Sequence, residues 1–170
     1  MLTTCRLIYS EAIEFLYKSN SFFISTKSED YPTAGYLSYF FLPQRMNQIT
    51  KLHLDWDLDH GQHFHPNLMP GGLKDEWFNA WDALKKLTGL NQLYIRLFFR
   101  YDLWNQCYGF FWERNSEQLL EPVKAITTPR DFTIKLPNWR CPTDIDVGDS
   151  HCVFEVPARV DGDDVDDSLW

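Results

Sequence analysis

Three short segments alternate apolar with polar side chains, and this pattern decides the class of fold. Leu, Ile, Phe or Trp occupies every second position of residues 51–56, 92–98 and 132–137, with polar or charged residues between them. Side chains two apart on a β-strand point to the same side of a sheet, so each segment is predicted to be a strand with one buried and one wetted side. Such strands are typical of a sheet that is covered on one face only.

The segments between these strands are predicted to be helical. Residues 75–88 place large apolar side chains on one face, and Gly89 follows as the expected C-cap. Residues 116–126 have Ser116 as the expected N-cap, and Pro122 is expected to split or bend them. Strands that alternate with helices indicate parallel βα units joined by right-handed crossovers.

The N-terminal segment, residues 3–19, has the helical spacing of an amphipathic helix. We expect its apolar stripe to be buried, with Cys5 as a small core side chain. The stripe contains Cys5, Ile8, Tyr9, Ala12, Ile13 and Leu16.

Residues 21–26 suit a further strand, and residues 36–48 suit a helix that Pro43 either breaks or begins. A last strand is predicted over residues 152–160, followed by an acidic segment, 161–170, that we expect to be a solvated, flexible tail.

Together these segments predict one α/β domain over residues 1–160, a length that suits a single core. The strands start near residues 21, 50, 91 and 131, with separations of roughly 29, 41 and 40 residues, a loose repeat. The predicted architecture is therefore a short, irregular, leucine-rich-repeat-like βα solenoid, with a mostly parallel sheet and helices on one face.

The polar side of this sheet is the predicted binding face. Rows of side chains on a rigid, uncovered sheet suit a protein or peptide ligand, because little entropy is lost when the ligand docks. We expect the partner to be a protein. We also expect Tyr94→Ala with Arg96→Ala to abolish binding while leaving the thermal transition nearly unchanged. The predicted binding residues are Lys51, His53, Asp55, Tyr94, Arg96 and Lys135.

Three groups of residues in the N-terminal half of the sequence form a recognisable motif. They are Thr4, Cys5, Arg6, Ile8, Tyr9, Ser10, Glu11, Ala12, Leu16, Tyr17, Asn20 and Phe22, then Leu42, Pro43, Arg45, Ile49, Leu52, Leu54 and Trp56, then Trp77, Trp81, Leu84, Leu87, Gly89 and Leu90. With these residues the sequence resembles, over about residues 2–97, a group of uncharacterised filamentous-fungal proteins with F-box-like and leucine-rich-repeat-like features. Longer members often have an F-box-like segment upstream of the first helix. The resemblance implies no established activity and no catalytic residues.

Three of the five histidines, His60, His63 and His65, lie in the loop after residues 51–56. Imidazoles bind zinc or copper, but this spacing matches no established zinc motif, and the glycines and prolines of the loop do not hold the rings together. No nucleophile elbow or phosphate loop is present in the sequence. We predict a non-catalytic module without a cofactor. The alternative is a metal-dependent or hydrolytic enzyme with its site at His60–His65.

Charge and cysteine content limit the partners and the compartment. The chain has 16 basic and 24 acidic residues and no basic run, which argues against nucleic acid. No apolar run approaches the roughly 20 residues of a membrane helix. The four cysteines form no CxxC pair and are read as free thiols, so we expect an intracellular protein.

The aromatic segment 101–113 has no clean period and leaves two alternatives open. Its side chains, Trp104 and Trp112 among them, either pack over the core or form an exposed patch for a partner.

Overall fold

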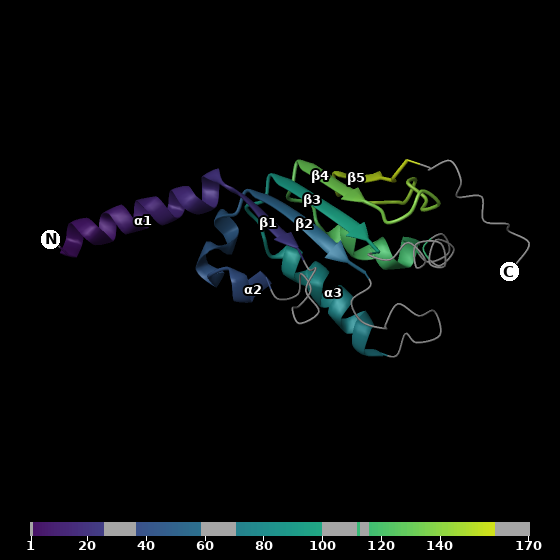
Figure 1. The fold of residues 1–170 in the computed structure, drawn as a ribbon, viewed down its shortest axis with the longest axis horizontal. Coiled ribbons are helices and arrows are strands. Elements are labelled where there is room, and N and C mark those ends of the chain that lie inside the picture. Colours follow the sequence, from purple (N-terminus) through teal and green to yellow (C-terminus); the bar gives the residue numbers. More distant parts are fainter. Residues whose placement is uncertain (1, 26–36, 59–70, 100–111, 113–115, 159–170) are drawn as a thin grey trace, which may run out of the picture.

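The computed structural model describes residues 2–25, 37–58, 71–99, 112 and 116–158, and these contain a five-stranded, all-parallel sheet (Figure 1). Strands that follow one another in the chain also lie side by side, in the order β1-β2-β3-β4-β5. The predicted α/β class and parallel sheet are confirmed. The strands are β1 (Ser21–Ser25), β2 (Lys51–Asp57), β3 (Gln92–Phe98), β4 (Asp131–Lys135) and β5 (Cys152–Glu155).

The helical segments connect these strands. Figure 1 shows α2, α3 and the helical residues 116–125 on one face of the sheet, whereas α1 extends away from the sheet beyond β1. As expected, Pro43 begins a helical turn, and the α-helix of residues 116–120 changes to a 3-10 helix just before Pro122. The segments are α1 (Leu2–Ser19), α2 (Leu37–Phe40), η2 (Pro43–Gln48), α3 (Gly71–Lys85) and η3 (Glu121–Ala125).

The core lies between the sheet and α3. Alternate residues of β2 and β3, such as Leu54 and Ile95, are fully buried, which confirms the predicted strand parity. The Trp56 ring lies 4.5 Å from that of Trp77 on α3, and Trp77 Nε1 donates a hydrogen bond to the carbonyl oxygen of Leu119 at 2.9 Å. These contacts join β2, α3 and the helical residues before η3 into one apolar cluster.

Trp112 belongs to the same cluster. It is fully buried, with its ring 6.2 Å from that of Trp77, so at this position the aromatic segment packs into the core. Trp104 and the other residues of segment 101–113 lie outside the described residues.

The predicted burial of the α1 stripe is wrong. Ile8 and Tyr9 are 60% and 64% exposed, and Cys5 is also exposed rather than a core residue. Near the C-terminal end of α1 the helix reaches the core, where the buried Tyr17 ring lies 5.5 Å from that of Phe22 on β1. Further from β1 the helix runs past the edge of the sheet, which leaves Ile8 and Tyr9 exposed (Figure 1).

The predicted role of Gly89 is also wrong. α3 ends at Lys85, and Gly148, at φ 57°, is the glycine with a positive φ among the residues described. Gly89 is required for a different reason: a Cβ added there would lie 1.9 Å from the carbonyl oxygen of Asn47. The turn before β3 therefore touches the backbone at the end of η2.

The last strand is shorter than predicted. β5 ends at Glu155, whereas the sequence pattern suggested a strand as far as residue 160. Pro157 follows closely, and proline lacks the N–H that would continue the ladder.

Candidate binding face of the sheet

Strand register arranges the side chains opposite the helices into rows across the sheet, here called the polar sheet face. All four strand pairs are in parallel register, so side chains at matching positions lie next to one another. The first row is Ser21, Lys51, Gln92 and Asp131. The middle row is Phe23, His53, Tyr94, Thr133 and Val153. The third row is Ser25, Asp55, Arg96, Lys135 and Glu155.

The middle row is largely aromatic. The His53 ring lies 4.8 Å from that of Phe23 and 4.5 Å from that of Tyr94, so the rings of three neighbouring strands form one continuous aromatic surface. Phe23 and Val153, at opposite ends of the row, are 60% and 58% exposed. The row thus offers apolar contact area at both edges of the sheet, with polar ring atoms between them.

The third row is organised around a buried carboxylate. Asp55 is only 3% exposed, and Arg96 Nη2 donates a hydrogen bond to Asp55 Oδ2 at 2.5 Å. His53 Nε2 lies 3.2 Å from Asp55 Oδ1, and the Arg96 guanidinium lies over the Phe98 ring at 4.9 Å. Asp55 and Phe98 therefore fix the guanidinium from two sides, which lowers the entropy cost of a further contact by Arg96.

Burial gives Asp55 a different role from the one predicted. It lies on the polar sheet face, as its strand parity requires, but its side chain is not accessible to a partner. Asp57, one position further along the same side of β2, is equally buried. Asp55 and Asp57 are therefore inaccessible at this end of β2, whereas Arg96 and Lys135 of the third row are partly exposed.

Basic side chains and a histidine ring are accessible on this face. The side chains of Arg96 and His53 are 39% and 41% exposed. Lys51 and Lys135 form no ion pair within the described parts of the chain, whereas the Asp55 charge is compensated by Arg96. The face also has exposed acidic residues, Asp131 in the first row and Glu155 in the third, so its accessible charges are mixed.

The environment of Tyr94 also differs from that of an exposed tyrosine. Partial burial raises the pKa of its phenol, the negative charges of Glu155 and Asp55 raise it further, and the positive charge of Arg96 opposes them. Tyr94 is therefore a neutral hydroxyl that donates or accepts a hydrogen bond over the whole physiological pH range.

The structure thus brings all six predicted binding residues onto one face, although Asp55 is covered. The prediction missed Val153, which alternates with the buried Cys152 and Phe154 and follows the same period of two as the other strands. It also missed the covered end of the face, because the pairing of Asp55 with Arg96 joins residues 41 positions apart.

The alternative enzymatic site falls where the structure gives no description: His60, His63 and His65 lie outside the described residues. Within residues 2–25, 37–58, 71–99, 112 and 116–158, no group of three or more His, Cys, Asp or Glu side chains is placed to hold a metal ion. Burial raises the pKa of Cys152 to about 12, so this cysteine is a thiol rather than a reactive thiolate at neutral pH. No helix in these same ranges is long and apolar enough to cross a membrane.

Comparison with known families gave one match. Residues 1–157 match the family described as "Domain of unknown function (DUF7730)", which covers every described element from α1 to β5. Searches of curated proteins and of solved structures gave no match.

Proposed function

We propose that this chain, which belongs to the DUF7730 family, is a non-catalytic module that binds a protein or peptide through the polar sheet face. The observation that carries the proposal is the pair of adjacent rows, one aromatic and one charged, on the side of the sheet opposite the helices. Tyr and Arg are enriched at binding hot spots, and here Tyr94 and Arg96 lie two residues apart on the same side of β3.

The chemistry of the two rows favours a partner segment of a particular kind. An apolar or aromatic side chain of the partner would lie along Phe23, His53 and Tyr94, and an acidic side chain would reach Arg96 or Lys135. Because the backbone beneath is a hydrogen-bonded sheet, little of the binding energy is lost in ordering this side of the interface.

The finer structural proposal is that the fold is an irregular leucine-rich-repeat-like unit of the kind seen in the fungal, F-box-like proteins it resembles, and that it acts inside the cell. Sequential parallel strands with helices on one face support the repeat-like interpretation. Two cysteines, Cys5 and Cys152, are free thiols, which supports a reducing compartment.

The test requires a substitution that removes the binding side chains and spares the fold. The sequence suggested Tyr94→Ala with Arg96→Ala, but Arg96 neutralises the buried Asp55, so its loss leaves a buried carboxylate without its cation. We expect Arg96→Ala alone to cost on the order of 2–3 kcal/mol of stability, since the partner charge is buried and Arg96 is partly exposed. Tyr94→Ala with Lys135→Ala is the better pair, because neither side chain neutralises a buried charge.

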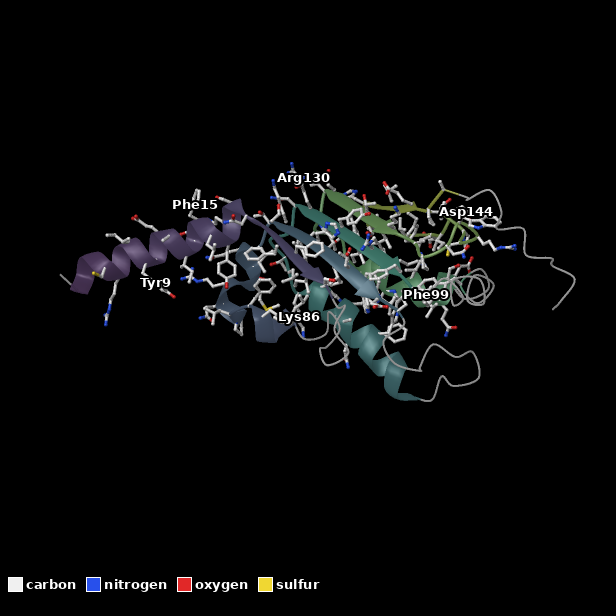
Figure 2. The ribbon with its side chains drawn as sticks, in the orientation of Figure 1. Tyr9, Phe15, Lys86, Phe99, Arg130 and Asp144 are labelled. Carbon is white, nitrogen blue, oxygen red and sulfur yellow. The ribbon has the colours of Figure 1, made fainter. Side chains whose placement is uncertain are left out.

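A partner isolated from fungal lysate with the wild-type chain is then titrated against this double variant by calorimetry. We expect binding to weaken at least about tenfold for each lost hot-spot contact. The matched control is Lys86→Ala, an exposed lysine after α3, away from the polar sheet face (Figure 2). Unchanged affinity in a folded double variant would contradict the proposal, and so would stoichiometric zinc or copper in the purified untagged protein together with a metal-dependent hydrolysis.

A further inference from the structure

The exposed stripe of α1 is the largest feature that the proposed function leaves unexplained. It differs from the stripe predicted from the sequence in that Ile13 packs against the core and the exposed Phe15 is included. The exposed stripe consists of Cys5, Ile8, Tyr9, Ala12, Phe15 and Leu16. These residues lie within one third of the helix circumference, next to the side on which Ile13 and Tyr17 contact the core. Ile8, Tyr9, Phe15 and Leu16 are 60%, 64%, 69% and 49% exposed.

An exposed projection of this composition needs something to pack against it. An isolated helix of this length is marginal in water, and residues 2–12 contain two Thr and one each of Cys, Ile, Tyr and Ser, which are modest helix formers. Figure 1 shows α1 reaching well beyond the sheet. Helix propensity alone therefore does not account for this segment.

The spacing of the stripe identifies the kind of surface that fits it. Cys5, Ile8, Ala12 and Phe15 are separated by three, four and three residues, which is the a/d pattern of a coiled coil, with Tyr9 and Leu16 beside it. Such a seam receives side chains of another helix between its own. The occupant is therefore helical rather than a strand or a lipid surface.

We propose that the occupant is α1 of a second copy of this chain, in an antiparallel two-helix interface. In an antiparallel pair each a position lies beside a d position, so Cys5 meets Phe15 of the second copy and Ile8 meets its Ala12. Each large side chain then packs against a small one. A parallel pair would set Phe15 against Phe15 and Ala12 against Ala12, which alternates crowding with voids.

Charge and shape allow two copies to approach in this way. α1 has two basic residues, Arg6 and Lys18, and two acidic residues, Glu11 and Glu14, so the helix is neutral in a chain whose net charge is -8. Because α1 extends beyond the sheet, an antiparallel neighbour places the second sheet at the opposite end of the helix pair. The two acidic bodies are therefore kept apart.

The area is sufficient for a specific contact. At about 150–250 Å² for a large side chain, Ile8, Tyr9, Phe15 and Leu16 expose on the order of 400–500 Å² in each copy. Two copies thus contribute roughly 800–1,000 Å² before Cys5 and Ala12 are added, close to the about 1,000 Å² that a specific interface requires.

Sedimentation equilibrium of the full chain tests the proposal. The wild-type protein should sediment at twice the 20.2 kDa mass of the chain, and Ile8→Glu and Phe15→Glu should each reduce this to the mass of a single chain. Both side chains are exposed, so the variants should keep the near-ultraviolet circular dichroism of the buried tryptophans. Arg6→Glu is the matched control. It changes the charge of α1 more than Ile8→Glu or Phe15→Glu does, but Arg6 is exposed and lies outside the exposed stripe, so this variant should remain a dimer.

Two results would overturn the proposal. One is a wild-type chain that stays monomeric up to about 100 µM, where an interface with a micromolar Kd is populated. The other is dissociation by Arg6→Glu as complete as that by Phe15→Glu, which would reflect charge repulsion alone.

Cysteine cross-linking tests the orientation, in a Cys107→Ser background with copper phenanthroline as the oxidant. With Phe15→Cys, the antiparallel pair should give a disulfide between Cys5 of one copy and the introduced thiol of the other. Rapid formation of a Cys5–Cys5 disulfide in the chain without Phe15→Cys would overturn the antiparallel arrangement.

Discussion

Replacing Gly89 with alanine should unfold this chain more readily than any other single methyl addition among its described residues. The added Cβ would lie 1.9 Å from the carbonyl oxygen and 2.8 Å from the carbonyl carbon of Asn47, and 3.3 Å from the oxygen of Ile49. All three atoms belong to the backbone, so no side chain can rotate away. The turn before β3 and the end of η2 must therefore move apart.

The size of the effect follows from the required movement. A Cβ needs about 3.0–3.4 Å from such an oxygen, so one backbone segment must shift by more than 1 Å. Leu87, Leu90 and Ile49, which flank the contact, are all at most 1% exposed, and moving them opens the core on both sides. Over-packing commonly costs about 1–3 kcal/mol, and a backbone clash in such a rigid position belongs at or above the upper end, about 3 kcal/mol.

Equilibrium unfolding in urea, followed by the fluorescence of the buried tryptophans, measures this cost. Gly148→Ala is the matched control, since its nearest atom is the Cβ of Lys124 at 3.6 Å and only its φ of 57° opposes a side chain. That substitution should cost roughly 1 kcal/mol. If Gly89→Ala lowers the free energy of unfolding no more than Gly148→Ala does, the turn before β3 and the end of η2 do not approach as closely as the structure shows. The steric explanation of Gly89 would then be wrong.

Three further predictions use other parts of the structure. Leu54→Ala should lower the free energy of unfolding by about 2–5 kcal/mol because the side chain is fully buried. His53→Ala, on the polar sheet face, should lower it by less than about 1 kcal/mol. If His53→Ala lowers the urea midpoint more than Leu54→Ala does, the strand register is wrong by one residue. Cys5 should react with a thiol reagent at pH 8 in the folded protein, and Cys152, whose pKa is raised to about 12, should react only after unfolding, as peptide mapping would reveal. The pKa of Tyr94 is higher in the folded chain than in the unfolded one, so the stability linked to its neutral phenol is fully present below pH 10. This stability should be lost as the pH rises through the folded pKa. In thermal unfolding, Tyr94→Phe should therefore lose less stability at alkaline pH than the wild type.

The sheet could be predicted from the sequence because its signal is local. The alternation of Leu52, Leu54 and Trp56 with polar residues states which side of β2 is buried, and the same period marks β3 and β4. The helices between them then require parallel strands. Strand bounds were predicted within two residues for β2, β3 and β4.

The position of α1 could not be predicted by the same reasoning. Helical spacing shows that an apolar stripe exists, but not whether the body of the protein extends far enough to cover it. Among the side chains of α1 that the structure describes, Ile13 and Tyr17 are the ones that pack against the core. The loop carrying His60, His63 and His65 lies outside the described residues, so the interpretation of these histidines stays a prediction.

The polar sheet face shows where strand parity stops being informative. Parity places Asp55 and Arg96 on the same side of the sheet, and it predicts that both are exposed. Whether a side chain is exposed depends also on its neighbours in the folded sheet, and the register of β2 and β3 pairs Asp55 with Arg96. In that register the Arg96 guanidinium lies beside the buried Asp55 carboxylate and over the Phe98 ring. Under the proposed function, Asp55 supports the Arg96 side chain instead of contacting the partner. Asp55→Asn should then weaken binding because it frees Arg96, not because a contact with the partner is lost.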